Sequence, residues 1–135
     1  MHSLFSPAQL GPLNLSNRLV RSATMDPYGQ ADGTIDPRQI PLYESIAASG
    51  VGLIITGHTA VSLLGRASAP QNLFSDDAYL PGQRQVTQAV HRQGGKIILQ
   101  ISHAGANSLL PAPEGTARFS PSGIPVNPKG LSFKA

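Results

Sequence analysis

The sequence contains no cysteine, which excludes disulfide bonds, thiolate nucleophiles, iron–sulfur ligation and cysteine-based zinc sites within its 135 residues. Aromatic residues make up only 5% of the chain, and its ten Lys and Arg residues are dispersed from Arg18 to Lys134. Nucleic-acid binding is therefore not expected, because it relies on stacking aromatics and clustered positive charge. Also missing are a run of roughly 20 apolar residues, which a membrane span requires, and the pattern of an export signal. These absences predict a soluble, cytoplasmic protein without membrane partners.

Three short apolar runs predict buried strands, in a chain whose 40% apolar content is sufficient for one core. They are RLVRSA at 18–23, VGLIIT at 51–56 and KIILQI at 96–101. Two predicted helices separate the runs, so the order is strand, helix, strand, helix, strand. This order is typical of an α/β fold with parallel strands.

The two predicted helices have recognisable start and stop signals. The first follows Asp36 and Pro37, a good N-cap and N1 pair, and ends at Gly50. The second runs from about 81 to 92 and stops before Gly94 and Gly95. Each helix has one apolar face for packing on the sheet, made of Tyr43, Ile46 and Ala47 in the first and Val86, Ala89 and Val90 in the second.

The longest connections all follow strands: 24–36, 57–78 and 102 to the end. In parallel α/β folds the carboxyl ends of the strands form the ligand-binding face, so function is expected there. Within the last connection, the Pro-rich stretch 106–135 is predicted to be an irregular loop over this face. Residues 1–17, with a turn at Gly11-Pro12, predict a β-hairpin that plugs the opposite end of a barrel.

One residue in the third predicted strand does not fit a buried apolar run. Strand alternation places Ile98, Gln100 and Ser102 on the inner face and the other aliphatic residues on the outer face. A buried amide without partners costs about 1 to 3 kcal/mol, so a partner for Gln100 is expected. That partner is either the polar edge of a heterocycle or a neighbouring strand, in which case Gln100 is purely structural.

Polar side chains follow each of the three predicted strands and are expected to converge on one rim. They are Ser22, Thr24, His58, Thr59 and His103. His58 and His103 could ligate a metal, but no H-x-H or H-E-x-x-H pattern occurs. We therefore expect no metal site, and favour histidines that bond a ligand or the backbone.

Three stretches together resemble the old yellow enzyme family, the FMN-dependent NAD(P)H:flavin oxidoreductases and ene-reductases. They are LFSPAQLGPLNLSNRLVRSAT, GVGLIITGHTAV followed by Gly65-Arg66, and AVHRQGGKIILQISHAG, which together cover most of residues 4–105. The resemblance implies a (β/α)8 TIM barrel with FMN at its C-terminal rim. Residues 1–135 would then be a partial flavin-binding domain, with about three βα units and the N-terminal hairpin.

The resemblance also implies roles for individual residues. Ser22, Ala23 and Thr24 would lie along the flavin, and Met25 near the isoalloxazine ring. His58 would touch the flavin through its backbone, and Gln100 would bond the pyrimidine edge. Tyr28 and His103 are candidates for substrate contacts or for positions in the loops. The chain departs from the family pattern at three positions, where proline, a redox-tuning cysteine and arginine are replaced by Ala23, Met25 and Ala106.

By the same resemblance, NAD(P)H would deliver hydride to flavin N5, and reduced flavin would pass it to the β-carbon of an activated alkene. That alkene would be an α,β-unsaturated carbonyl or an enoyl thioester. A complete barrel takes about 250 residues, so we expect an N-terminal part of a longer enzyme, inactive alone, with catalytic residues beyond Ala135. Two alternatives stay open: a self-associating, non-catalytic half-barrel, in line with a possible homo-oligomer, and a metal-dependent TIM-barrel lyase.

Overall fold

Three parallel strands lie side by side in the computed structural model, which describes residues 3–26, 28–112, 114 and 120. They are β3 (Val20–Arg21), β4 (Leu53–Ile55) and β6 (Ile97–Ile98), in the order β3-β4-β6. Each strand lies within one of the three predicted apolar runs, so the predicted strands and their parallel pairing are confirmed. The observed strands are shorter than the predicted ones.

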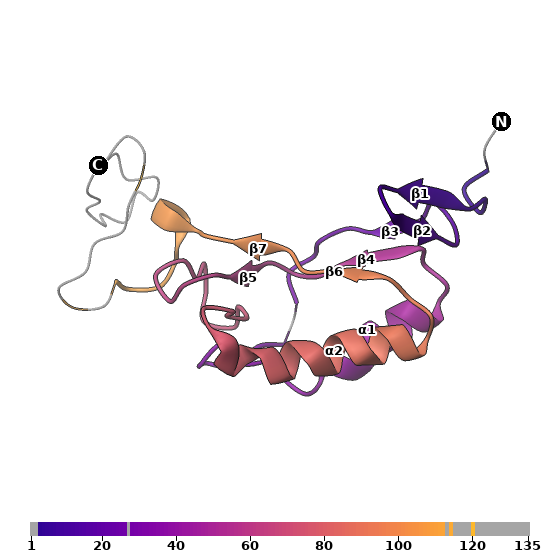
Figure 1. Ribbon diagram of the computed structural model, residues 1–135. Coiled ribbons are helices and arrows are strands. Elements are labelled where there is room, and N and C mark those ends of the chain that lie inside the picture. Colours follow the sequence, from indigo (N-terminus) through magenta and orange to yellow (C-terminus); the bar gives the residue numbers. More distant parts are fainter. Residues whose placement is uncertain (1–2, 27, 113, 115–119, 121–135) are drawn as a thin grey trace.

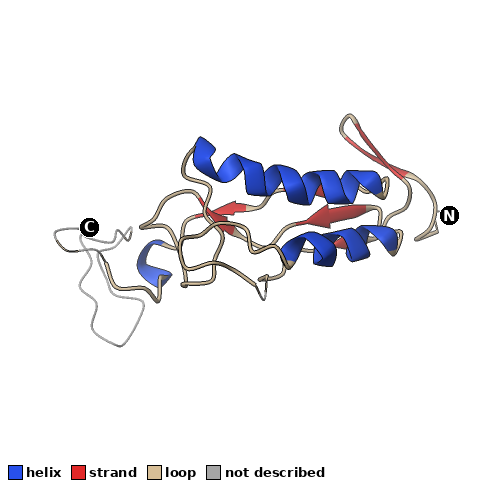
Figure 2. Ribbon diagram, turned by 90° about the horizontal axis from the view of Figure 1, so that it is seen from below, coloured by secondary structure: helices blue, strands red, loops and turns tan. Residues whose placement is uncertain are grey.

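Two helices pack against one face of this sheet and lie alongside each other (Figures 1 and 2). Helix α2 (Leu80–Arg92) matches its predicted range closely. Helix α1 (Gln39–Ala48) begins later than predicted, because residues 37–38 form a turn before it. The Asp36 carboxylate accepts a hydrogen bond of 2.9 Å from the Arg38 backbone N–H, and therefore caps that turn.

The hydrophobic core lies between the helices and the sheet. Its buried members are Tyr43 and Ala47 on α1, Ile54 on β4, and Val86 and Val90 on α2. The spacing of four residues within each helix places both members on one face, as the sequence predicted. Burying each large apolar side chain contributes about 1.5 to 3 kcal/mol, so these contacts hold the helices on the sheet.

The third predicted strand is interrupted, which the alternation of its residues did not reveal. Ile55 pairs with Ile98, and the next paired residues are Thr59 and Ile101. Residues 56–58 therefore lie opposite residues 99–100, so the segment from β4 to β5 contains one extra residue. This arrangement is a β-bulge. Within the bulge, the Thr56 side-chain oxygen accepts from the backbone N–H of Gln100 at 3.0 Å. Two further short strands follow, β5 (Thr59–Ala60) and β7 (Ile101–Ser102).

An antiparallel hairpin precedes the sheet, formed by β1 (Ala8–Leu10) and β2 (Leu13–Leu15) around a turn in which Gly11 has a φ of 54°. Figure 1 shows this hairpin at the end of the molecule away from β5 and β7. Its role as the plug of a barrel stays a prediction.

Two short 3-10 helices complete the secondary structure of the described residues, η1 (Asp77–Tyr79) and η2 (Gly105–Asn107). The Asp76 side chain caps η1 by accepting from the Ala78 N–H, as expected for the approach to α2. Most of the predicted irregular stretch 106–135 lies outside the described residues. Among the helices that the structure describes, none has the length and apolar character needed to cross a bilayer.

Candidate functional site

The loops that follow β5 and β7 lie at the end of the molecule opposite the hairpin (Figure 1). Arg66 connects the loop after β5 with the loop after β3. Its guanidinium is buried at 3% exposure and donates to the carbonyl of Ala31 at 2.7 Å and that of Gln71 at 3.1 Å. It also donates to the carbonyls of Gln30 and Ala69. Four backbone acceptors around one planar cation hold the two loops in a fixed relation.

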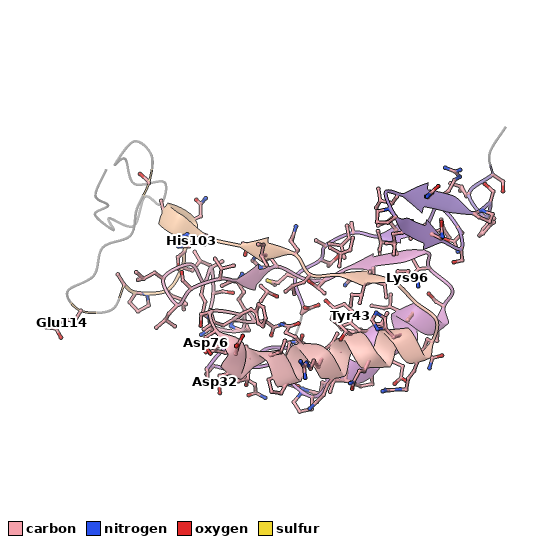
Figure 3. The ribbon with its side chains drawn as sticks, viewed as in Figure 1. Asp32, Tyr43, Asp76, Lys96, His103 and Glu114 are labelled. Carbon is pink, nitrogen blue, oxygen red and sulfur yellow. The ribbon has the colours of Figure 1, made fainter. Side chains whose placement is uncertain are left out.

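A second connection lies beneath these loops, between α1 and the ends of β3 and β4. The Tyr43 hydroxyl lies 2.8 and 2.9 Å from the two carboxylate oxygens of Asp26, and it accepts from the Gly57 N–H at 2.9 Å. Figure 3 shows Tyr43 between the helices and the sheet. A Cβ added at Gly57 would lie 2.6 Å from Asp26 Oδ2 and 2.8 Å from the Thr24 carbonyl oxygen. Glycine thus permits the ends of the two strands to touch.

Burial raises the pKa of the Asp26 carboxyl above its ordinary value, although the Tyr43 hydrogen bond and the nearby Arg21 and His58 oppose this rise. Burial is also the main cause of a raised pKa at the Tyr43 hydroxyl. The pair therefore favours the neutral tyrosine as donor to Asp26.

His58 is held from the side by Gln71, a buried residue of the loop after β5. The Gln71 side-chain nitrogen lies 3.1 Å from His58 Nδ1 and 3.1 Å from the Ser102 hydroxyl oxygen. A small cavity separates His58 from the loop after β3, and Met25, Asp26 and Asn72 are among the residues that line it. Residues from three loops thus meet at His58.

Gln100 is exposed, which corrects the expectation of a buried amide. No hydrogen bond to its side chain occurs among the described residues. Ile98, two positions earlier, is 41% exposed, and Val20 on β3 is 48% exposed. The face of the sheet away from the helices is therefore open within the described part of the chain, and the Gln100 amide is available to a ligand.

The segment after β3 is largely accessible as well. Ser22, Thr24 and Met25 are exposed and Ala23 is half-buried. The Thr24 hydroxyl donates to the Ser22 carbonyl at 3.2 Å. This segment therefore exposes the hydroxyl-bearing residues Ser22 and Thr24.

Thr59 does not lie on the rim, contrary to the sequence prediction. It is 1% exposed and lines a cavity that Tyr43 of α1 and Val86 of α2 also line, on the helix-covered side of the sheet. The bulge explains this, because one extra residue reverses the side to which the following side chains point.

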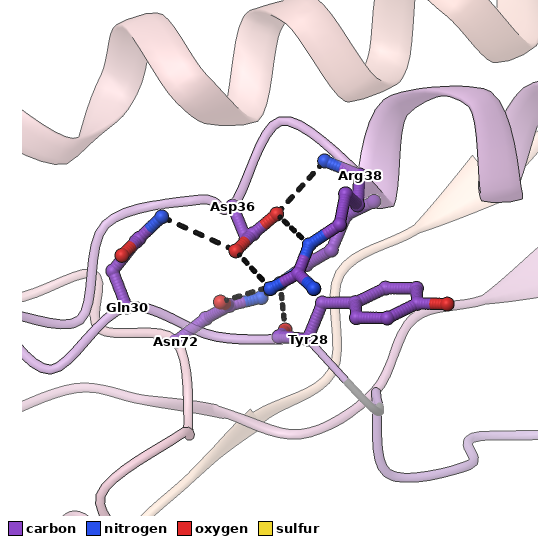
Figure 4. A network of polar contacts seen from close by, with 6 residues as sticks. Tyr28, Gln30, Asp36, Arg38 and Asn72 are labelled. Atoms are coloured by element: carbon purple, nitrogen blue, oxygen red, sulfur yellow. Dashed lines mark hydrogen bonds and ion pairs between the residues drawn. The ribbon is translucent and has the colours of Figure 1, made fainter.

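The two loop candidates have local roles in the structure. Figure 4 shows the contacts around Tyr28, whose carbonyl accepts from the Gln39 side chain and whose ring lies 4.5 Å below the Arg38 guanidinium carbon. His103 is exposed, and its Nδ1 accepts from the Gly105 N–H at 3.1 Å. In the part of the chain that the structure describes, no three Asp, Glu or His side chains are grouped to hold a metal ion.

Sequence reasoning did not assign roles to Asp26, Gln71 or Asn72. Asn72 and Gln39 exchange two hydrogen bonds of 2.9 Å through their side-chain amides, so the loop after β5 is fixed to α1. No spacing rule marks such pairs, because their members lie 33 positions apart in the sequence. Arg66 could have been found, since it belongs to a stretch that carries the family resemblance.

Comparison with known proteins agrees with the resemblance in the sequence. The model of the "NADH:flavin oxidoreductase / NADH oxidase family" matches residues 3–130. An NADH oxidase of Thermoanaerobacter brockii is 36% identical over 126 residues, which is 93% of this chain and 19% of that protein. An NADPH dehydrogenase of Halalkalibacterium halodurans is 41% identical over 115 residues, covering 83% of this chain and 33% of the relative.

Among solved structures, morphinone reductase superposes with a TM-score of 0.79 at 34% identity, over 91% of this chain and 32% of that one. The chain thus spans a third or less of these proteins. The matched old yellow enzymes are TIM barrels, so the expected fold class is confirmed, with an open three-stranded part of the barrel in the described residues. The family and its relatives support FMN as cofactor and NADH or NADPH as co-substrate. With its model matched along nearly the whole sequence, the chain belongs to the NADH:flavin oxidoreductase / NADH oxidase family, the family of the old yellow enzymes.

Proposed function

We propose that this chain forms one side of the FMN site of an NAD(P)H-dependent oxidoreductase that reduces activated alkenes. The observation that carries the proposal is the Gln100 amide, which stands on the open face of the sheet and has no hydrogen-bond partner within the described part of the chain. An amide can both donate and accept, so it matches the alternating donors and acceptors on the pyrimidine edge of a flavin.

The residues present fit a flavin at this position. Ile98 and Val20 give the open face apolar surface for a flat ring, and they are 41% and 48% exposed. Ser22, Ala23, Thr24 and Met25 would lie along the ring, and His58 would contact it through the backbone. The loops that carry these residues are held by the buried side chains of Arg66 and Tyr43, so the site is formed before a ligand arrives.

The hydride chemistry, from NAD(P)H to an α,β-unsaturated carbonyl or an enoyl thioester, is supplied by FMN when it is bound. The chain's own contribution is to orient the ring and exclude water from one of its sides. Tyr28 and His103 remain candidates for substrate contacts. A cytoplasmic location, a small-molecule substrate and assembly into a homo-oligomer remain predictions.

A titration with FMN, followed by quenching of flavin fluorescence, tests the role of Gln100. Replacement Gln100→Ala removes the amide from the open face, and one lost hydrogen bond of about 1 kcal/mol weakens FMN binding about five-fold. Gln88→Ala, at an exposed position of α2, is the matched control and should leave the affinity unchanged. Equal affinities of the two variants, or no FMN binding to the unaltered protein, would overturn the proposal.

Self-association is the second candidate function, and the exposed apolar face favours it. Val20 and Ile98 leave apolar surface uncovered, and β3 and β6 each have an edge without a partner strand among the described residues. Sedimentation over a range of protein concentrations separates the two candidates when it is combined with the FMN titration. A concentration-dependent assembly without saturable FMN binding would favour a non-catalytic module.

A further inference from the structure

A small cavity lies between the sheet and the two helices, on the side away from the open face. The space in which the centre of a water molecule fits is about 10 Å³, which is roughly what one water molecule needs. The cavity lining combines apolar residues with several polar side chains. The polar side chains that line it include Asp26, Gln39, Tyr43, Thr59, Asn72 and Gln83.

Thr59 presents an unpaired hydroxyl to this cavity. The residue is 1% exposed, and in the described part of the chain its side-chain oxygen is the one buried side-chain nitrogen or oxygen atom without a hydrogen-bond partner. Leaving such a group unpaired costs about 1 to 3 kcal/mol. The Thr59 backbone cannot move to relieve this cost, because its N–H donates to the Gln100 carbonyl at 2.8 Å within the parallel pairing.

The groups across the cavity have hydrogen-bonding capacity to spare. Asp26 accepts from Tyr43, but a carboxylate offers about four acceptor sites. The Gln83 amide forms no side-chain hydrogen bond within the described residues. By contrast, Gln39 and Asn72 satisfy each other through two reciprocal bonds. The free hydrogen-bonding capacity therefore lies on Thr59 of β5, on Asp26 of the loop after β3 and on Gln83 of α2.

We propose that this cavity binds one structural water molecule, which bonds the Thr59 hydroxyl and bridges it to Asp26 and Gln83. The water connects three segments of the chain that share no direct side-chain hydrogen bond at this point. A cation is a poorer occupant, because hard cations take six or more oxygen ligands and the cavity offers one carboxylate. The site lies on the opposite side of the sheet from the flavin proposed above, so it does not depend on that proposal.

The test replaces Thr59 by valine, which has nearly the same shape but no hydroxyl. If the water is bound, Thr59→Val removes one of its partners and lowers the melting temperature by several degrees. If the cavity is dry, removal of an unpaired hydroxyl leaves the melting temperature unchanged or raises it. The matched control is Thr87→Val, because the Thr87 hydroxyl already bonds the Arg84 carbonyl at 3.0 Å in the exposed part of α2.

A crystal structure at high resolution supplies the second measurement and decides the matter even if Thr59→Val fails to fold. The expected result is one density peak within hydrogen-bonding distance of the Thr59 hydroxyl in the unaltered protein, kept in Thr59→Ser and lost in Thr59→Val. An empty cavity in the unaltered protein, or a peak with the short contacts and ligand number of a metal ion, would overturn the inference.

Discussion

The two faces of the β3-β4-β6 sheet differ in what contacts them. On the helix side, Ile54 is fully buried against Tyr43 and Val86. Among the described residues, every fully buried side-chain nitrogen or oxygen is hydrogen-bonded except the Thr59 hydroxyl. On the other side, Ile98 and Gln100 are exposed, and the Gln100 amide has no partner among the described residues. One face therefore supplies the packing that stabilises this chain, while the other is left uncovered among the described residues.

The largest effect that distinguishes the faces is expected from a pair of isoleucine truncations. Ile54→Ala removes a fully buried side chain and should lower the free energy of unfolding by about 2 to 5 kcal/mol. Ile98→Ala, on the open face, should lower it by less than about 1 kcal/mol. Urea unfolding at two protein concentrations measures both. A large loss in Ile98→Ala that grows with concentration would mean that a second copy covers the open face.

A smaller effect is expected where two loops meet at a buried cation. Arg66→Met keeps the volume of the side chain but leaves the carbonyls of Ala31 and Gln71 without their donor, and should cost about 3 kcal/mol of unfolding free energy. Arg38→Met is the matched control, because the Arg38 side chain is 65% exposed and its ion pair with Asp36 is screened by water. If both variants lose the same amount, burial of Arg66 is not what joins the loops.

The smallest expected effect is on the pH dependence of stability, and its sign differs between two aspartates. Burial raises the pKa of Asp26, so the folded chain holds this proton more tightly, and stability is lost as pH rises above 3.8 through the folded pKa. The Arg38 side chain lowers the pKa of Asp36 to about 2, so its contribution is lost as pH falls from 3.8 towards 2.

Denaturant unfolding over a range of pH separates these two contributions. Asp26→Asn should flatten the curve above pH 3.8, and Asp36→Asn should flatten it below that value. Curves of unchanged shape in both variants would show that neither carboxyl titrates differently in the folded and unfolded states.

Sequence patterns predicted the elements of the covered face well. Helical spacing identified Tyr43, Val86 and Val90, because burial against a sheet imposes a period that a single segment records. The start of α1 was predicted too early, since Asp36 is a good cap both for a helix and for the turn that actually forms.

The candidate site was harder to predict, for two physical reasons. The exposure of Gln100 depends on which elements cover the sheet, and a strand pattern does not show that. The side to which Thr59 points depends on one extra residue in the pairing of two segments about 40 positions apart, which no local pattern records. Residues that the family resemblance assigned, such as Ser22 and Thr24, are accessible as a ligand site requires.

The bulge between β4 and β5 makes the orientation of the β5 side chains depend on the number of residues in the segment 56–58. Side chains alternate between the two faces along a strand. Deletion of one residue from the segment 56–58 would therefore move each side chain of β5 to the opposite face of the sheet. Thr59 would then turn towards the open face of the sheet, and Ala60 would turn towards the helices. An insertion or deletion of one residue here would therefore exchange the inward-facing and outward-facing side chains of β5, rather than only change the length of a loop.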